Sequence, residues 1–187
     1  MRRSLLFAAL AALCGPGAAH AASPLEEGLS GALRGCAEWV LNPNSWASGP
    51  APFVAAVGLG QTMGLVPQVD EVSLPPKPLR AGNHYWRINS TPRAGYVLVV
   101  SDQLPMCHIT GGGDVDLKPM VEAVLSAPTF TDHWKRQSDQ SRDGMVTTVF
   151  KNAEDPAFSI AISRARKAGQ RLDRVQVIAT ATYEMSK

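Results

Sequence analysis

Residues 174–184 read RVQVIATATYE, and this stretch decides the fold class. Apolar or small residues take every second position, from Val175 to Tyr183, while Gln176, Thr180 and Thr182 stand between them. Such alternation is typical of a strand that packs one face on a core and turns the other to water. The C-terminal stretch therefore predicts an antiparallel sheet with one polar face.

Other segments upstream have the same strand character. Residues 96–101 form a continuous apolar run, which favours a central position in the sheet. The remaining strand-like segments are 84–89, 106–110, 145–151 and 158–163, and a short edge strand is expected near 69–74. We predict an antiparallel sheet of five or six strands.

Two segments have helical periodicity. Ser23 and Pro24 are good residues for a helix start, and apolar residues recur after them at helical spacing. Residues 117–126 form a second amphipathic helix with Asp116 as its cap, and residues 52–63 form a weaker, glycine-containing one. Residues 111–113, three glycines, are interpreted as a turn before the second helix. The predicted class is α+β, with one helix packed on the sheet and an N-terminal helix.

The N-terminus has the features of an export signal. Arg2 and Arg3 precede the apolar run 5–13 and the small-residue stretch 15–22. Cleavage after Ala21 divides the chain into a signal peptide, 1–21, and a single domain, 22–187. We therefore expect a periplasmic or secreted protein. The apolar run is too short to span a bilayer, so no transmembrane segment is expected in the mature chain.

The charge balance argues against a nucleic-acid partner. The chain has 18 Lys and Arg residues and 16 Asp and Glu residues. Removal of Arg2 and Arg3 lowers the basic count from 18 to 16, which leaves the mature domain near neutrality. Binding to nucleic acid requires a basic surface field, and the composition provides none.

The cysteines predict a disulfide. Cys14 lies in the signal, so Cys36 and Cys107 remain, and two cysteines in an oxidising compartment usually pair. The bridge would join the N-terminal helix to the sheet. The alternative is a free catalytic thiol at Cys107, which would need an imidazole from the set His84, His108 and His133.

No pattern in the sequence specifies a metal or a cofactor. Histidines and aspartates supply metal-ligand types, but none has a recognised ligand spacing. The three glycines lack the Lys-Ser or Lys-Thr pair of a phosphate loop, and Asp114 and Asp116 place negative charge beside them. We therefore predict no cofactor, no metal site and no catalytic residues.

Two features indicate a surface for a partner. A basic cluster lies near the last hairpin, at Arg164, Arg166, Lys167 and Arg171. Trp46, in a Pro/Gly/Ser loop, and Trp134, in an amphipathic stretch, are candidate aromatic anchors, since aromatic residues are enriched at interface hot spots. A solvated hairpin tip is the alternative explanation for the basic cluster.

A longer set of motifs spans residues 84–184. It comprises the aromatic segment His84-Tyr85-Trp86, the apolar segment 95–101, a strand containing Cys107 and the helix pattern Leu-x-x-Met-Val-x-x-Val-Leu. This order resembles small uncharacterised exported proteobacterial proteins. The resemblance implies the fold and the compartment, and it implies no activity.

The leading functional hypothesis is a non-enzymatic interaction or accessory module that binds an envelope or extracellular protein. A cell-envelope hydrolase using Cys107 and a histidine is one alternative. A small-ligand-binding protein is another, with its pocket expected between the sheet and the proline-rich segment 65–82.

Overall fold

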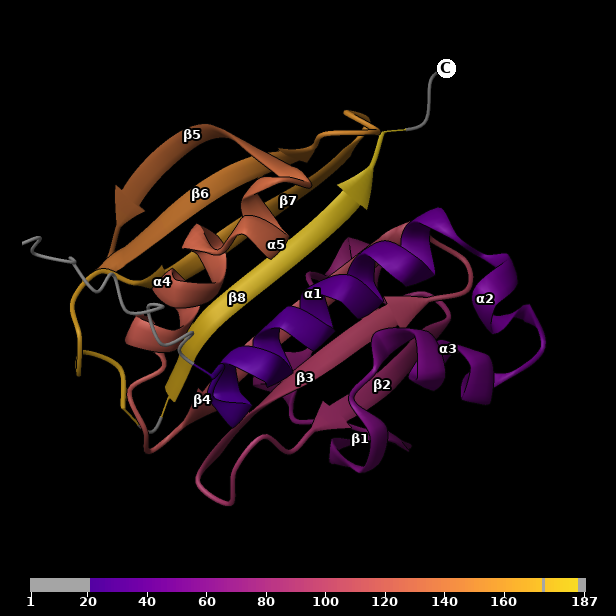
Figure 1. Ribbon diagram of the computed structural model, residues 1–187, viewed down its shortest axis with the longest axis horizontal. Helices are drawn as coiled ribbons and strands as arrows, with labels where there is room; N and C mark the ends of the chain where they lie inside the picture. Colours follow the sequence, from indigo (N-terminus) through magenta and orange to yellow (C-terminus); the bar gives the residue numbers. More distant parts are fainter. Residues whose placement is uncertain (1–20, 173, 185–187) are drawn as a thin grey trace, which may run out of the picture.

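The computed structural model describes residues 21–172 and 174–184, and its centre is one antiparallel sheet of eight strands (Figure 1). The spatial order is β1-β2-β3-β4-β8-β7-β6-β5. The strands are β1 Met63–Val66, β2 Asn83–Ile88, β3 Ala94–Ser101, β4 Met106–Gly113, β5 Trp134–Arg142, β6 Met145–Asn152, β7 Phe158–Ala165 and β8 Arg174–Tyr183. The predicted signal peptide, residues 1–21, therefore lies outside the described residues except for Ala21.

The predicted sheet of five or six strands is wrong, because the sheet has eight. Sequence patterns found neither of the two edge strands, β1 and β5. The edge strand expected near 69–74 is absent, and a 3-10 helix, η2 Glu71–Ser73, lies there instead. An edge strand is covered less than a central one, so its sequence carries little alternation.

All the α-helices of the described residues lie on one face of the sheet (Figure 1). This also corrects the prediction of a single packed helix beside the N-terminal one. The helices are α1 Pro24–Leu41, α2 Asn44–Ala47, α3 Pro50–Val57, α4 Lys118–Ser126 and α5 Pro128–Thr131, with further 3-10 turns at η1 Gly60–Thr62 and η3 Lys77–Leu79. The weak helix predicted at 52–63 is thus α3 followed by η1.

The long helix α1 is fixed to the sheet along its length. Ser23 and Glu26 form a capping box at its start. The hydroxyl of Tyr96 on β3 donates to the Leu25 carbonyl at 3.0 Å, and the indole N–H of Trp39 donates to the Ser101 carbonyl at 2.7 Å. Both donors are buried, so each hydrogen bond also satisfies a group that would otherwise cost free energy.

Small residues bring α1 close to its neighbours. A Cβ on Gly31 would stand 2.5 Å from Cγ of Leu59, so a larger residue here would require the Leu59 side chain to move. The three glycines at 111–113, predicted as a turn, are the end of β4. The ring of Tyr96 lies over Gly111, where a Cβ would meet it at 2.5 Å. The absence of a side chain at this point of β4 therefore leaves room for a core tyrosine.

The chain repeats one topology twice. Each half begins with helices and continues into four antiparallel strands, β1 to β4 in the first half and β5 to β8 in the second. The last strands of the two halves, β4 and β8, pair antiparallel at the centre of the sheet. The first strands, β1 and β5, are consequently the two outer edges.

A polar network fixes α4 to the second half. The side chain of Arg164 on β7 is only 10% exposed and donates to Glu122 of α4 at 2.8 Å and to Thr148 of β6 at 2.9 Å. Thr148 in turn donates to Asp139 on β5 at 2.6 Å. Burial opposes ionisation of Glu122, but hydrogen bonds from Arg164 and Lys118 prevail and lower its pKa.

Candidate functional site: an uncharged sheet edge

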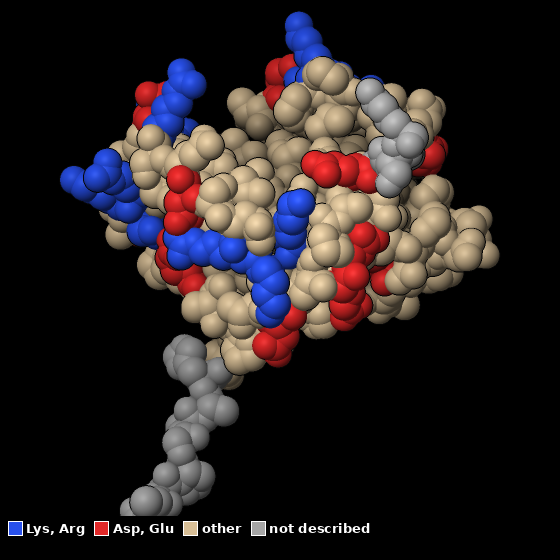
Figure 2. Space-filling model, turned by 90° about the horizontal axis from the view of Figure 1, so that it is seen from above, with Lys and Arg blue, Asp and Glu red and all other residues tan. Residues whose placement is uncertain are grey.

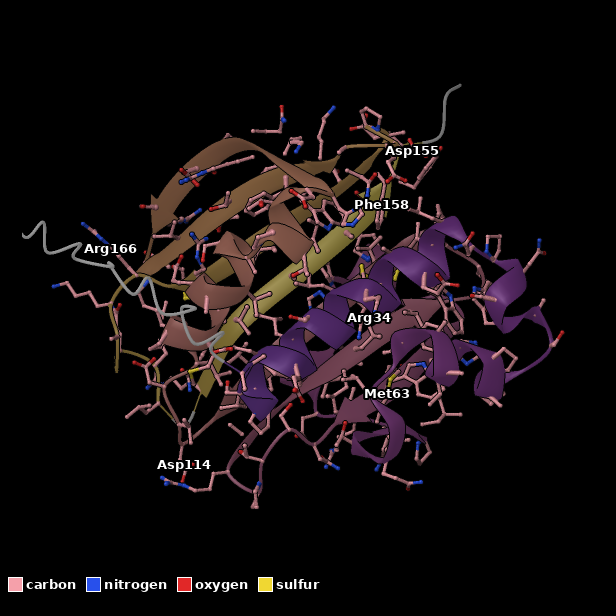
Figure 3. All side chains as sticks on the ribbon, in the orientation of Figure 1. Arg34, Met63, Asp114, Asp155, Phe158 and Arg166 are labelled. Carbon is pink, nitrogen blue, oxygen red and sulfur yellow. A yellow bond between two sulfur atoms is a disulfide. The ribbon has the colours of Figure 1, made fainter. Side chains whose placement is uncertain are left out.

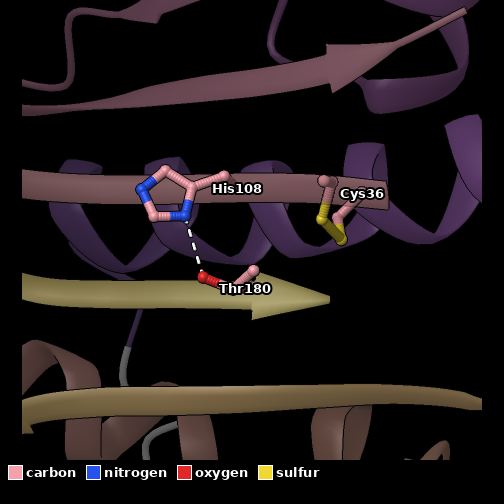
Figure 4. Close-up of a disulfide and its surroundings, with 4 residues drawn as sticks. Cys36, His108 and Thr180 are labelled. Carbon is pink, nitrogen blue, oxygen red and sulfur yellow. Dashed lines mark hydrogen bonds between the residues drawn. A yellow bond between two sulfur atoms is a disulfide. The ribbon is translucent and has the colours of Figure 1, made fainter. Parts of the chain in front are cut away.

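The predicted disulfide is confirmed: Cys36 of α1 is bonded to Cys107 of β4, with their Cα atoms 5.5 Å apart (Figure 4). Both residues are fully buried. His108, the next residue on β4, points to the opposite face of the sheet and shares a 2.8 Å hydrogen bond between its Nδ1 and the Thr180 hydroxyl. Burial lowers the pKa of His108 to about 4.

His84 and His133, the other histidines that could serve a thiol site, are each paired with an acidic side chain. His84 Nε2 contacts Asp102 at 3.3 Å, and His133 Nδ1 lies 3.7 Å from Glu154. Both pairs are substantially exposed. Each candidate histidine is therefore paired with a hydroxyl or a carboxylate. Cys107 has no free thiol, because its sulfur is part of the disulfide.

The predicted basic cluster is divided by the structure. Arg164 is buried in the polar network, whereas Arg166 and Lys167 are exposed in the loop between β7 and β8. Arg171 is half-buried and donates to the Val175 carbonyl at 2.9 Å. Arg166 lies far from Met63, the first residue of β1 (Figure 3).

The two candidate aromatic anchors are both packed. Trp46 stacks on Trp39 with ring centroids 4.5 Å apart and donates its indole N–H to the Trp39 carbonyl at 3.0 Å. Trp134 is 7% exposed and contacts the rings of Phe130 and Phe158. Trp46 remains half-buried, so one part of it is still accessible.

A long run without charged residues forms part of the surface of the first half. Residues 39–69 contain no Asp, Glu, Lys or Arg. This run includes all of α3, whose sequence PAPFVAAV has no polar side chain, and all of β1, with the sequence MGLV. Much of it is exposed. Leu65 keeps 54% of its surface, and five residues of α3 are exposed: Pro50, Ala51, Pro52, Ala55 and Ala56. We call α3 and β1 together the β1–α3 surface.

The backbone of β1 is open along its outer side. The Asn89 N–H donates to the Thr62 carbonyl at 2.8 Å, and in an antiparallel ladder hydrogen-bonded pairs alternate with non-bonded pairs. It follows that Gly64 and Val66 bond to β2. Met63 and Leu65 direct their N–H and C=O groups away from β2, toward the side where no described strand pairs.

A hollow of about 650 Å³ lies beside this edge. Its wall combines α3, the turn after it and the first strands, and every lining residue is apolar or glycine: Pro50, Ala51, Val54, Ala55, Gly58, Gly60, Met63, Gly64, Leu65 and Trp86. Met63 lies beside α3 at the start of β1 (Figure 3). The indole N–H of Trp86 is buried and has no acceptor among the described residues. A buried donor without an acceptor is uncommon in the interior of a folded protein.

The opposite edge is built differently. β5 carries Lys135, Arg136, Asp139 and Arg142, all exposed, and an irregular register between Arg136 and Ser138. Figure 2 views the side of the molecule where β5 lies in Figure 1, and charged side chains of both signs are spread across it. Charges and bulges on an edge strand oppose pairing with another chain. The described part of β1 has neither device.

A second hollow, of about 900 Å³, follows α1. Leu33 and Ala37 of α1 line it together with Phe130, Trp134 and His133 from the second half. The pocket expected between the sheet and residues 65–82 is not among these hollows, although Leu65 lies at the margin of the first.

Comparisons with known proteins gave no match: no family model, no curated protein and no solved structure is similar to this chain. Within residues 21–172 and 174–184, no helix is long and apolar enough to cross a membrane. No group of three or more His, Cys, Asp or Glu side chains in the same residues is placed to hold a metal ion.

Proposed function

We propose that this protein is an exported, non-enzymatic interaction module that binds an extended segment of another protein along β1. The bound segment continues the sheet as a further strand and places its side chains over the hollow beside α3. The observation that carries the proposal is the uncharged, partly exposed β1–α3 surface, whose strand has outward backbone groups with no described partner.

Physical chemistry supports this use of the edge. Strand addition derives affinity from main-chain hydrogen bonds and specificity from pockets that receive alternate side chains. Met63 and Leu65 offer the hydrogen-bonding groups, and the 650 Å³ hollow offers a shallow, open apolar surface for side chains. Exposed apolar surface of this kind is found at interaction sites of soluble proteins.

The same observations weigh against the hydrolase alternative. The sulfur of Cys107 is held in a buried disulfide, whereas a nucleophile must reach its substrate as a thiolate. Export, which would maintain the disulfide, remains part of the proposal.

The test is selection of peptides from a random displayed library on the mature protein, residues 22–187. We expect the selected peptides to shift the NMR amide signals of Met63 and Leu65 and the indole N–H signal of Trp86. These are the groups that a strand on β1 would contact or approach.

Matched variants on the two edges make the test specific. Leu65→Lys places a charge on β1 and should abolish binding, while Gln140→Lys places one on β5 and should leave it unchanged. Peptides that bind both variants equally, or that shift signals only along α1 or β5, would overturn the proposal.

A further inference from the structure

Arg87 stands next to the open edge and has no described partner. It lies on β2 directly opposite Gly64 of β1, on the face of the sheet that carries no α-helix. Its side chain is exposed, and no acidic group of the described residues forms an ion pair or hydrogen bond with it. A free guanidinium at this place adds one positive charge to a surface that otherwise has none.

Gly64 leaves the path from Arg87 to the edge clear. A Cβ at Gly64 would meet nothing within 4 Å, so the space above this residue is open. Neighbouring strands lie about 4.8 Å apart, so a strand added to β1 would run about 9.6 Å from β2. An arginine on β2 and a glutamate or aspartate on the added strand can together span the distance between these two strands, because the glycine between them has no side chain.

The alternation of side chains fixes which residue of the added strand meets Arg87. The residue opposite Gly64 shares the face of Arg87, because paired residues point to the same side of a sheet. The residues on either side of it share the face of Met63 and Leu65, and therefore of the apolar hollow. A single segment thus meets one positive charge between two apolar sites.

We infer that the segment bound at β1 has an acidic residue between two aliphatic residues, with its carboxylate paired to Arg87 across Gly64. This inference rests on the proposed function, since it names the class of sequence that the same site takes. The side chains on the helix face enter the hollow lined by Val54, Leu65 and Trp86.

The same charge disfavours a second copy of this chain as the occupant. If two β1 strands paired with Gly64 opposite Gly64, both Arg87 side chains would lie on one face of the joined sheet. The two β2 strands would be about 14 Å apart, three strand spacings, and both guanidinium groups would face the same pair of glycines with no carboxylate between them. A partner with an acidic residue at that position is complementary instead.

The test uses three blocked pentapeptides, Thr-Val-X-Leu-Thr, in which X is Glu, Gln or Lys. NMR titration of the mature protein follows the Met63 and Leu65 amides. We expect the Glu peptide to bind roughly threefold more tightly than the Gln peptide, and the Lys peptide to bind more weakly again by a similar factor, as for an exposed ion pair. Added salt should reduce only the differences between the peptides.

A charge reversal completes the design. Arg87→Glu should invert the order, so that the Lys peptide binds best, while the matched change Arg142→Glu on β5 should leave the order unchanged. Equal binding of the three peptides at β1 would overturn the acidic preference and leave the proposed function standing. Failure of all three to bind at β1 would overturn both. Self-association through β1 in sedimentation, abolished by Leu65→Lys, would assign the edge to a second copy and overturn the inference.

Discussion

The two halves of the sheet share a topology but are fixed to their helices by different interactions. In the first half, the Cys36–Cys107 disulfide holds α1 on β4, and close contacts at Gly28 and Gly35 hold it on β3. In the second half, α4 is held by the ionic network around Arg164. The difference teaches that one arrangement of helix and antiparallel strands can be stabilised either by a disulfide with neutral contacts or by a network of charged side chains.

The same contrast extends to the edges. The first half ends in β1, which is uncharged and open, and the second ends in β5, which is charged and irregular. A surface that is held rigid before binding loses less conformational entropy when a partner docks. The covalently fixed half is therefore the better place for an interaction edge, and the predictions below test whether the halves differ in this way.

Removal of the disulfide should have the largest effect. The bridge links residues 71 positions apart, and loop-closure entropy for a loop of that length corresponds to about 4 kcal/mol. We expect the double variant Cys36→Ser, Cys107→Ser to lose about that much free energy of unfolding in urea titrations. A loss below about 1 kcal/mol would show that noncovalent contacts suffice to hold α1, and the contrast between the halves would fail.

The free energy of unfolding should depend on pH through His108, which lies on β4 where the two halves pair. The pKa of this residue is about 4 in the folded state, below the 6.5 of an ordinary histidine, because it is buried beside Thr180. A lowered pKa means that the unfolded chain takes up the proton first. Stability is therefore complete above pH 6.5 and falls as the pH drops toward 4, by up to about 3 kcal/mol.

The variant His108→Gln isolates this contribution. It should flatten the dependence of the unfolding free energy on pH between 6.5 and about 4.5, above the range in which most carboxylates titrate. His133→Gln, at an exposed position, is the matched control and should leave the slope intact. An unchanged slope in His108→Gln would assign the pH dependence to other groups.

Breaking the network of the second half should cost about 2 kcal/mol. Arg164→Met removes the guanidinium and leaves Glu122 and Thr148 without their shared donor. Loss of one partner from a buried pair costs more, but Glu122 keeps 43% of its side chain in water, which moderates the penalty. Thermal unfolding of Arg164→Met, of Glu122→Leu and of the double variant measures the coupling. A loss in the double variant equal to the sum of the two single losses would show that the two residues do not interact.

Much of the central fold followed from the sequence. The alternation in residues 174–184 and the apolar run 96–101 correctly predicted β8 and β3, because both strands pack one face under helices. The pairing of Cys36 with Cys107 was predicted from the two cysteines that remain once the predicted signal peptide is set aside. These features are imposed by burial, and burial is what hydrophobic periodicity records.

The two edge strands and the candidate site were not predicted from the sequence, for a related reason. All of β5 except Trp134 is exposed, so its sequence has no apolar period, and β1 is only four residues long. The interface residues proposed from the sequence were chosen for charge and aromaticity, and Arg164 and Trp134 proved to serve the interior. The charge-free run 39–69 was the available signal, since an uncharged segment that is not buried needs another explanation.

The smallest effect on stability should come from the edge itself. Leu65→Lys changes a side chain that is 54% exposed, so we expect the unfolding free energy to change by less than about 0.5 kcal/mol. The lysine would nevertheless protect β1 as Lys135 and Arg142 protect β5, and peptide binding should be lost. Urea titration and peptide titration of the same preparation separate the two effects. A drop of more than about 1 kcal/mol would mean that Leu65 belongs to the core of the first half, and the loss of binding would then report a damaged fold instead of a blocked edge.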